Sequence, residues 1–320
     1  MTNKLPQTLD FLLDKNWIED FFNQNVEKII GRQAEITVKE VKRSKSYAPE
    51  SFAMYYSVLV NAQETFWRVS ASTKQDRFLP FQAMSFVYKN GFNEGDIRTP
   101  QPYYFFSKYN FYIYQDVSGH MLTSFLKQKD QELEKKMFKA GEVLKKFHLL
   151  PTPDFALSKL QWDFQKEKIL EYAPEIKQIF EEPLTKALEK ITINGKKLCH
   201  GDYQTENLIF GHLTYLIDFG SVVTAHKEAD IASFISQLAV MLKRFGDIND
   251  FDNLSKSFFD GYGADFENEF FESYCFLYRL QILQALIIMY EVDPTVDKEE
   301  IKQTIEFLYN KIKLDNEPRN

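Results

Sequence analysis

The pattern of apolar and polar positions divides the chain into regions of different periodicity. Residues 7–31 place leucine, isoleucine and phenylalanine at helical spacing, and Gly31 is the residue type that commonly ends a helix. From Ile36 onward the pattern alternates, and three segments predict antiparallel strands: 36–43, 54–62 and 65–71. The chain therefore begins with a helix and continues into a sheet.

One more helix and two more strands complete this first region. Residues 78–90 predict a helix that ends at Gly91. Residues 102–109 and 110–117 alternate again and predict two strands. Residues 36–117 are thus expected to contain three strands, a helix and two strands, in that order.

Beyond residue 117 the pattern is mainly helical. Helical periodicity is found in residues 130–149, 160–190, 231–242 and 270–291. We expect Pro174 and Pro183 to break the second of these segments, because proline lacks a backbone donor. A short segment with strand character, residues 196–220, interrupts the helices.

These elements predict an α+β fold with two domains. The first domain, residues 1–116, contains the N-terminal helix and a five-stranded antiparallel sheet with one helix. The second domain, residues 117–320, is mainly helical. The boundary lies near residues 115–119, and such boundaries are common locations for ligand clefts.

Composition and charge exclude several classes of protein. The chain has 39 Lys and Arg against 46 Asp and Glu, for a net charge of −7, and no basic run. This balance argues against nucleic acid as a partner. The most apolar stretch, Cys275–Tyr290, is interrupted by Arg279 and by glutamines. It is therefore predicted to be too short and too polar to span a membrane.

The N-terminus and the cysteines indicate a cytoplasmic protein. Asp10 and Asp14 lie where a signal peptide would need an unbroken apolar core. The two cysteines, Cys199 and Cys275, are too few for a disulfide framework or a structural zinc site. We therefore expect a reduced, soluble, cytoplasmic protein.

The segment His200–Gly220 carries the candidate chemistry. Asp202 lies in a predicted turn, and Asn207 follows five residues later. Asp218 ends an apolar strand and precedes Phe-Gly. An amide oxygen and a carboxylate suit Mg²⁺, which prefers oxygen ligands, and a further carboxylate can accept a proton from a hydroxyl nucleophile. These are the groups that phosphoryl transfer requires.

The order HGD-x4-N followed by IDFG resembles the aminoglycoside phosphotransferase and choline kinase superfamily of small-molecule kinases. Three other segments are similar to family motifs: Leu144–Pro151 (LKKFHLLP), Glu228–Ile235 (EADIASFI) and Asn110–Leu122 (NFYIYQDVSGHML). The resemblance implies a two-lobed, protein-kinase-like fold, with a small antiparallel-sheet N-lobe and a larger helical C-lobe. It implies that the protein is a phosphotransferase with an alcohol group as acceptor.

The resemblance also implies roles for individual residues. Asp202 would be the catalytic base. Asn207 and Asp218 would hold Mg²⁺ against the nucleotide phosphates. The backbone carbonyl of Gln115 and the N–H of Val117 would bind the edge of the nucleotide base.

Further residues would support the loop and the nucleotide. His200 would position the catalytic loop, and Asp230 would brace it. Arg68 would present a cation to the phosphates, at a position where most of the family has lysine. Tyr114 would lie at the back of the base pocket, which leaves both ATP and GTP open as donors.

Two positions depart from the family pattern. The helix residue expected to pair with Arg68 is a glutamate in the family, but Gln82 occupies that register here. The phosphate-covering turn, Arg43–Ser51, contains no glycine, so backbone amides or the hydroxyls of Ser44 and Ser46 would have to serve. These departures motivate an alternative hypothesis, a catalytically weak regulatory module that binds nucleotide on a kinase scaffold.

The acceptor is not identified by the sequence. Aminoglycosides, amino-alcohols and sugars all fit a large aromatic cleft, and the oligomeric state is equally open. One segment bears on the charge of the acceptor, because residues 247–272 contain eight carboxylates and a single lysine. A solvated acidic face is the simpler interpretation of this segment, and a surface that receives a cationic substrate is the alternative.

Overall fold

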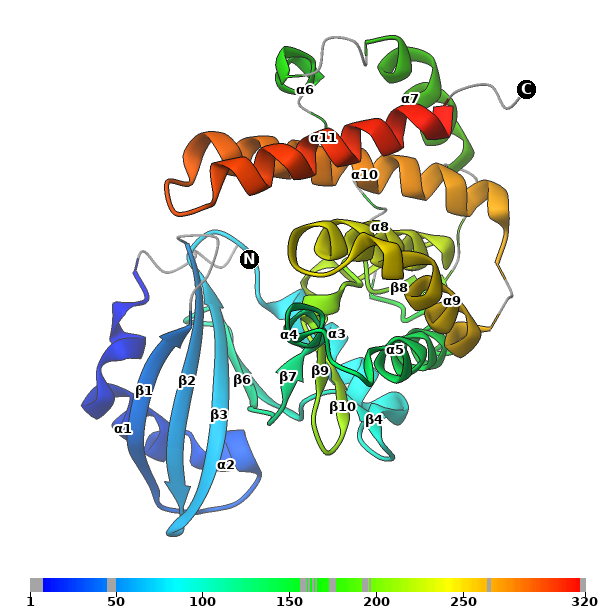
Figure 1. The fold of residues 1–320 in the computed structure, drawn as a ribbon. Coiled ribbons are helices and arrows are strands. Elements are labelled where there is room, and N and C mark those ends of the chain that lie inside the picture. The colour runs from blue at the N-terminus through cyan, green and yellow to red at the C-terminus, as the bar shows by residue number, and fades with distance from the viewer. Residues whose placement is uncertain are drawn as a thin grey trace. The chain divides into compact units, whose positions relative to one another are not determined.

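The computed structural model describes most of the chain. The described residues are 8–44, 50–155, 160, 162, 164, 166–172, 177–191, 195, 197–263 and 266–316. The chain divides into a first unit, Met1–Gly119 with Gly211–Gly220, and a second unit, His120–Phe210 with Ser221–Asn320 (Figure 1). The expected domains, 1–116 and 117–320, remain a prediction; the units differ from them chiefly because residues 211–220 group with the first unit.

An antiparallel sheet of five strands forms the centre of the first unit, in the order β1-β2-β3-β6-β5 (Figure 1). The strands are β1 (Ile36–Ser44), β2 (Ser51–Val60), β3 (Gln63–Ser72), β5 (Pro102–Phe106) and β6 (Phe111–Gln115). Asn61 and Ala62 form the tight turn between β2 and β3, and both have positive φ, 49° and 65°. All five predicted strands are present, but residues 61–62 and 107–110, which were predicted as strand, form turns.

Helical segments at the N-terminus supply the core on one face of this sheet. They are η1 (Asp10–Leu13), α1 (Lys15–Gln24) and α2 (Val26–Ile30). The ring of Phe22 packs edge-on against Trp67 and Tyr56, and Gly31 ends α2 at a φ of 74°. The sequence predicted one continuous helix here. The structure breaks it twice, at Asp14 and at Asn25, and the side chain of Asp14 caps α1 by accepting hydrogen bonds from two backbone N–H groups.

The remaining elements of the first unit connect the sheet to the segment before Asp218. Helix α3 (Phe78–Val87) continues into a wider turn, η2 (Tyr88–Phe92), where Gly91 has a φ of 107°. Strand β4 (Ile97–Arg98) then pairs in parallel with β10 (Thr214–Leu216). The side chain of Thr99 donates a hydrogen bond of 2.9 Å to the carbonyl of Leu216, two residues before Asp218.

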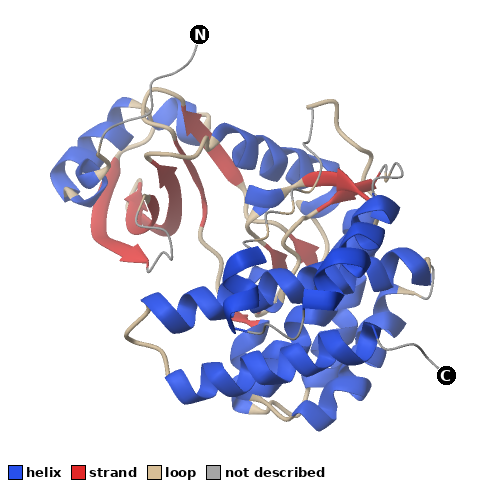
Figure 2. Cartoon of the chain, turned by 90° about the horizontal axis from the view of Figure 1, so that it is seen from above, coloured by secondary structure: helices blue, strands red, loops and turns tan. Residues whose placement is uncertain are grey.

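The second unit is mainly helical, which confirms the α+β fold (Figure 2). Its helices are α4 (Leu122–Gln128), α5 (Leu133–His148), α6 (Lys166–Tyr172), α7 (Lys177–Ile191), α8 (Glu228–Phe245), α9 (Phe251–Tyr262), α10 (Asn268–Val292) and α11 (Lys298–Asn316). Short strands β7 (His120–Met121) and β9 (Leu208–Phe210) pair with each other, as do β8 (Lys197–Cys199) and β11 (Val223–Ala225). Single 3₁₀ turns are η4 (Thr205–Asn207), η5 (Phe219–Ser221) and η6 (Ile248–Asp250).

Proline does not break the helix at one predicted position. Pro183 lies inside α7, so that prediction was wrong, and Pro174 lies outside the described residues. A proline inside a helix costs one backbone hydrogen bond and about 3 kcal/mol. Ala187 and its apolar neighbours pack in the same core as α10, and we infer that this packing offsets the cost.

Two glycines allow α5 and α9 to cross in direct backbone contact. A Cβ atom on Gly141 of α5 would overlap the carbonyl oxygen of Phe258 on α9. A Cβ atom on Gly261 of α9 would overlap the carbonyl oxygen of Phe138 on α5. Any side chain at either position would force the two helices apart.

The helix α10 is longer than its apolar stretch suggested. It has 25 residues, and its most apolar window of 18 residues has a mean hydropathy of 1.4, so by length and composition alone it could cross a membrane, and the expectation that the stretch is too short and too polar was wrong. Half of its most apolar window is buried inside the protein, and Leu277, Leu280 and Leu283 are fully buried in the helical core. Core helices of soluble proteins have the same character.

Candidate active site

The loop that carries Asp202 begins directly after β8 and depends on a glycine. Gly201 has a φ of 77°, a conformation that favours glycine. A Cβ atom at this position would overlap the carbonyl oxygen of Ser221. The glycine of the His-Gly-Asp sequence is therefore required by the path of the backbone.

The buried carboxylate of Asp230 holds this loop through hydrogen bonds to its backbone. Asp230, in the first turn of α8, is fully buried. Its Oδ2 accepts a hydrogen bond of 2.7 Å from the N–H of His200, and its Oδ1 accepts one of 2.8 Å from the N–H of Gly201. The position near a helix N-terminus also favours a negative charge. These contacts are those expected of a residue that braces the loop.

Two further side chains extend this support. His148, the last residue of α5, lies 3.0 Å through Nε2 from Oδ2 of Asp230. Its Nδ1 lies 2.9 Å from the hydroxyl of Tyr262 on α9. A tyrosine hydroxyl that donates to Nδ1 leaves the proton on Nε2, where it can be donated to the carboxylate. The sequence pattern did not single out Tyr262, because only the crossing of α5 and α9 brings it to His148.

The same cluster contains Cys199, but its chemistry does not suit a metal. His148, Cys199 and Asp230 place one ligand atom each within 4.8 Å of one another. The thiol of Cys199 donates to the backbone carbonyl of His226 at 3.3 Å, and His148 and Asp230 are bonded to each other. Because each of the three ligand atoms already has a partner within the protein, we interpret the cluster as structural.

Asp202 and Asn207 are brought together within the second unit. The amide nitrogen Nδ2 of Asn207 donates to the backbone carbonyl of Asp202 at 2.8 Å and to its carboxylate Oδ2 at 3.2 Å. Gln204 donates a second hydrogen bond, of 3.0 Å, to the same oxygen. These amides orient the carboxylate, as a positioned proton acceptor requires.

Asp218 belongs to the first unit and has an unusual backbone. It follows β10, is exposed, and has a φ of 62°. A positive φ at a residue other than glycine costs about 1–3 kcal/mol and is concentrated at functional sites. The carboxylate Oδ1 accepts a hydrogen bond of 3.3 Å from the N–H of Gly220.

Asn207 in the second unit and Asp218 in the first each offer an oxygen of the kind that suits a hard divalent cation. Oδ1 of Asn207 makes no hydrogen bond within the described part of the chain, since only its nitrogen is used. Asp218 has a single hydrogen bond among the described residues, which engages one carboxylate oxygen. A neutral amide oxygen and a carboxylate are ligands that Mg²⁺ accepts alongside waters and phosphates.

Two tyrosines of the first unit lie in the electrostatic field of Asp218. Burial, reinforced by the Asp218 charge, raises the pKa of Tyr112 to about 12. Burial is also the main cause of the raised pKa of Tyr114, and Asp218 adds to it. Both phenols therefore stay neutral at physiological pH, and Asp218 faces β6 within its own unit.

Arg68 is paired, but not with the helix residue that the family pattern predicts. Its Nε donates to Oδ1 of Asp116 at 2.5 Å, and Nη1 donates to the hydroxyl of Ser44 at 3.0 Å. Gln82 is not among its hydrogen-bond partners in the described chain. The pairing of β3 with β6, which places Arg68 opposite Tyr114 and so brings it near Asp116, is not visible in the residue pattern. The sequence therefore pointed to Gln82 instead.

The two residues expected at the nucleotide base lie where β6 ends. Gln115 is the last residue of the strand and pairs with Trp67, and its N–H donates to the carbonyl of Gln101 at 2.9 Å. The N–H of Val117 makes no hydrogen bond within the part of the chain that the structure describes. Of the predicted phosphate-covering turn, Ser46 lies outside the described residues.

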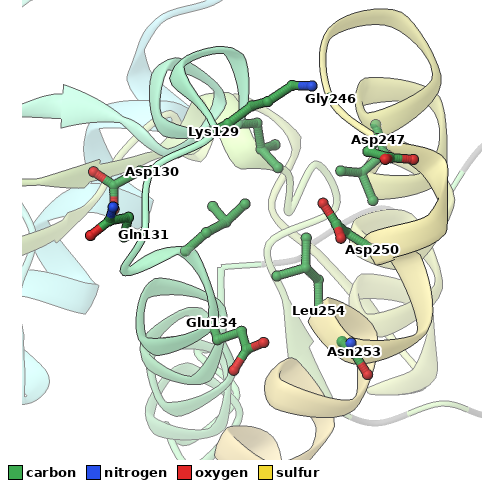
Figure 3. A pocket seen from close by; sticks show the side chains of 12 residues that line it. Lys129, Asp130, Gln131, Glu134, Gly246, Asp247, Asp250, Asn253 and Leu254 are labelled. Atoms are coloured by element: carbon green, nitrogen blue, oxygen red, sulfur yellow. The ribbon is translucent and has the colours of Figure 1, made fainter.

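Part of the acidic segment lines a small pocket in the second unit (Figure 3). The pocket has a volume of about 170 Å³ and lies between the start of α5 and the segment that leads into α9. Its carboxylates come from both sides and are Asp130, Glu134, Asp247 and Asp250. Lys129 is the cation among its lining residues, so the charge of the lining is negative.

Comparison with known proteins identifies the family. The phosphotransferase enzyme family (APH) matches residues 51–271, which is more than half of the chain. The chain therefore belongs to this family, and the resemblance to aminoglycoside phosphotransferases and choline kinases is confirmed. No curated protein sequence matches the chain.

Solved structures of related kinases share the fold. The amicoumacin kinase hAmiN, solved with AMP-PNP, Ca²⁺ and Ami, is 11% identical, with 86% of this chain and 88% of that chain covered and a TM-score of 0.59. A choline kinase from Cryptosporidium parvum Iowa II is 16% identical, with 93% and 95% covered and a TM-score of 0.58. A choline/ethanolamine kinase family protein from Mesorhizobium loti is 15% identical, with 88% and 89% covered and a TM-score of 0.53. At these identities the likeness establishes the protein-kinase-like fold.

Proposed function

We propose that the protein is a small-molecule kinase that transfers the γ-phosphoryl group of ATP or GTP to a hydroxyl of a small acceptor. The observation that carries the proposal is the way in which hydrogen bonds hold the carboxylate of Asp202. Its carboxylate is held by Asn207 and Gln204, on a loop whose backbone is bound to the buried Asp230. A carboxylate held in a fixed orientation is what proton transfer from an alcohol requires.

In this proposal Asp202 is the catalytic base. It orients the acceptor hydroxyl and takes its proton as the new bond to phosphorus forms. Orientation matters most, because the phosphoryl group passes through a loose transition state in which little covalent chemistry is left to the protein. His200 and Asp230 act only through the loop: they hold Asp202 in place.

Asn207 and Asp218 are assigned to Mg²⁺. The assignment is supported by their family motif and by the oxygens that their hydrogen bonds leave open. Mg²⁺, when bound, neutralises charge on the phosphoryl oxygens. Both side chains supply hard oxygen ligands, and Asn207 also connects this role to Asp202 through its nitrogen.

The nucleotide base is assigned to the carbonyl of Gln115 and the N–H of Val117. Arg68 belongs to the same nucleotide site through the strand register that places it opposite Tyr114. The resemblance supports these assignments, as does the open N–H of Val117. Both ATP and GTP remain candidate donors, and AMP-PNP and ATP are bound in solved relatives.

For the acceptor we propose an alcohol on a small, amine-bearing molecule, of the amino-alcohol, aminoglycoside or sugar type. The carboxylates of residues 247–272 and the negative lining of the pocket in Figure 3 favour a cationic acceptor. Neutral sugars belong in the same screen as the comparison set. We propose that this chemistry takes place in the cytoplasm, where both Mg²⁺ and nucleotide are abundant.

The proposal is tested by a phosphate-transfer screen over amino-alcohols, sugars and antibiotics, run with Mg-ATP and Mg-GTP. Once an acceptor is found, Asp202→Ala should lower turnover by about 100-fold or more, the scale of general-base catalysis. Nucleotide affinity, measured by calorimetry, should stay within about twofold, because this carboxylate acts on the acceptor. Asp20→Ala removes an exposed carboxylate of α1 and serves as the control.

The outcomes separate the two candidate functions. Undiminished turnover in Asp202→Ala would refute the role of this residue. Clear binding of Mg-nucleotide with no transfer to any acceptor would favour the alternative, a regulatory module that binds nucleotide. That alternative is motivated by the neutral Gln82 and the glycine-free turn.

A further inference from the structure

Two arginines lie along β3 and the loop that follows it in the first unit. Arg68 lies inside the strand, opposite Tyr114 and close to the residues assigned to the nucleotide base. Arg77 lies five residues beyond Ser72, the last residue of β3, and Ser72 pairs with Ser51, the first residue of β2 after the predicted phosphate-covering turn. Four residue steps of strand separate Arg68 from Ser72, a distance of about 13 Å at about 3.3 Å per residue.

The charge of Arg68 is already compensated within the protein. Its guanidinium forms an ion pair of 2.5 Å with Asp116, and the side chains of the pair are 34% and 18% exposed. Its Nη1 donates to Ser44. Two of the donors of Arg68 are thus engaged, and its charge is matched by a carboxylate between Gln115 and Val117.

Arg77 differs from Arg68 both in its hydrogen bonds and in the absence of an ion pair among the described residues. It lies where the chain enters α3, and its Nη2 donates a hydrogen bond of 2.8 Å to the hydroxyl of Ser51. Its Nε is buried and has no hydrogen-bond partner. No carboxylate of the described residues forms an ion pair with it. A half-buried guanidinium with an open donor and no counter-charge has the chemistry of an anion-binding group.

A buried asparagine holds Arg77 in place. Oδ1 of Asn110 accepts a hydrogen bond of 2.9 Å from the N–H of Arg77. Its Nδ2 donates to the carbonyls of Ser72, at 2.7 Å, and Gln75, at 2.8 Å. Asn110 is 3% exposed and has a φ of 50°. The loop between β3 and α3 is therefore fixed at three points.

Arg77 and the proposed metal ligand Asp218 both belong to the first unit. The charges of Arg77 and Asp218 both act on the hydroxyl of Tyr112, in opposite directions. The hydrogen bond from Arg77 to Ser51 places its guanidinium at the first residue of β2, which follows the turn that the family resemblance assigns to the phosphates.

We propose that Arg77, rather than Arg68, is the arginine that binds the β- and γ-phosphates of the nucleotide. This inference rests on the proposed function and names a binding residue within it. Guanidinium suits the role because its planar donors can form paired hydrogen bonds with two phosphate oxygens. Arg68, neutralised by Asp116, then supports the base end of the site, and the missing helix glutamate no longer weakens phosphate binding.

The test compares three arginine variants of the full-length protein: Arg77→Gln, Arg68→Gln and Arg32→Gln. Arg32 is exposed, lies in the same unit and serves as the matched control. Affinities for Mg-ATP and for adenosine, which lacks phosphate, are measured by calorimetry after circular dichroism has confirmed folding. We expect Arg77→Gln to weaken Mg-ATP binding by about 10-fold or more with adenosine binding unchanged, since charge-assisted contacts to phosphate are lost.

Arg68→Gln is expected to change the affinities for Mg-ATP and adenosine by the same factor. If instead Arg77→Gln binds Mg-ATP as Arg32→Gln does, the proposal is overturned while the kinase function stands. Failure of the unaltered protein to bind any Mg-nucleotide would overturn the proposed function as well. Should Arg77→Gln not fold, Arg77→Lys keeps the charge but loses the paired donors. Arg77→Lys should then weaken the binding of Mg-ATP but not that of adenosine. If its affinity for Mg-ATP equals that of the unaltered protein, the proposal is overturned.

Discussion

Different kinds of interaction stabilise two regions of the molecule, the loop around Asp202 and the surroundings of Arg68 on β3. In the second unit, the loop is held through its backbone, by N–H groups that donate to the fully buried carboxylate of Asp230. In the first unit, Arg68 is held through its side chain, and its pair with Asp116 is partly exposed. One region is fixed by buried donors and acceptors, and the other by pairs that water can reach.

This difference explains where the chain departs from its family. A backbone anchored on one buried carboxylate leaves few acceptable residues, so the HGD segment keeps the family pattern. Side-chain pairs near the surface can be exchanged for other pairs of similar energy. Gln82 can then replace the expected glutamate, since Asp116 supplies the carboxylate to Arg68 from a different element.

The largest effect is expected for Asp230→Ala, which removes the buried anchor. Three donors lose their acceptor: the N–H groups of His200 and Gly201, and His148. We expect the free energy of unfolding to fall by about 3–5 kcal/mol, because buried donors without partners carry their full desolvation cost. Urea unfolding measures this, with Asp20→Ala as the control. A loss below about 1 kcal/mol would show that the loop does not depend on this carboxylate.

A smaller but more specific effect is expected for Gly201→Ala. Its matched control is Gly31→Ala, since Gly31 has a similar φ, 74° against 77°, but open space around its Cβ position. Both variants should lose about 1 kcal/mol from the positive φ alone. Gly201→Ala must in addition displace Ser221, so it should lose stability by about 2 kcal/mol more and should also lose turnover. Equal losses in unfolding and turnover assays would contradict the steric argument.

The smallest effect is expected for Asp116→Asn, which tests the side-chain region. Because the pair with Arg68 is partly exposed, the free energy of unfolding should fall by only about 0.5–1 kcal/mol. The difference from the unaltered protein should shrink at about 1 M salt, where charges are screened beyond about 3 Å. Thermal unfolding at low and high salt measures both. A large, salt-independent loss would mean that the pair behaves as a buried one.

Much of the fold follows from residue patterns, because burial on one face imposes a period. The alternation of β1, β2 and β3 and the helical spacing of α5, α8 and α10 correspond directly to buried positions. Local exceptions depend on tertiary contacts: Asp14 interrupts the N-terminal helix by capping α1, and Pro183 is tolerated inside α7. Residue propensities alone do not predict those contacts.

The candidate site was predictable where it is local in sequence. Asp202 and Asn207 are five residues apart, and a short turn must bring them together. Asp116, Arg77 and Tyr262 were not predictable, because each gains its role from a partner distant in the chain. Strand register decides which side chain reaches Arg68, and a helix crossing decides which hydroxyl reaches His148.

The contact between Gly141 and Gly261 has a consequence for laboratory evolution of this protein. Helix α9 carries acidic residues that a library for new acceptors would naturally randomise. Because both glycines touch the opposite backbone, any larger residue there would move α9 and withdraw Tyr262 from His148. Libraries that leave these two codons unchanged should therefore retain far more folded members than libraries that vary the whole helix.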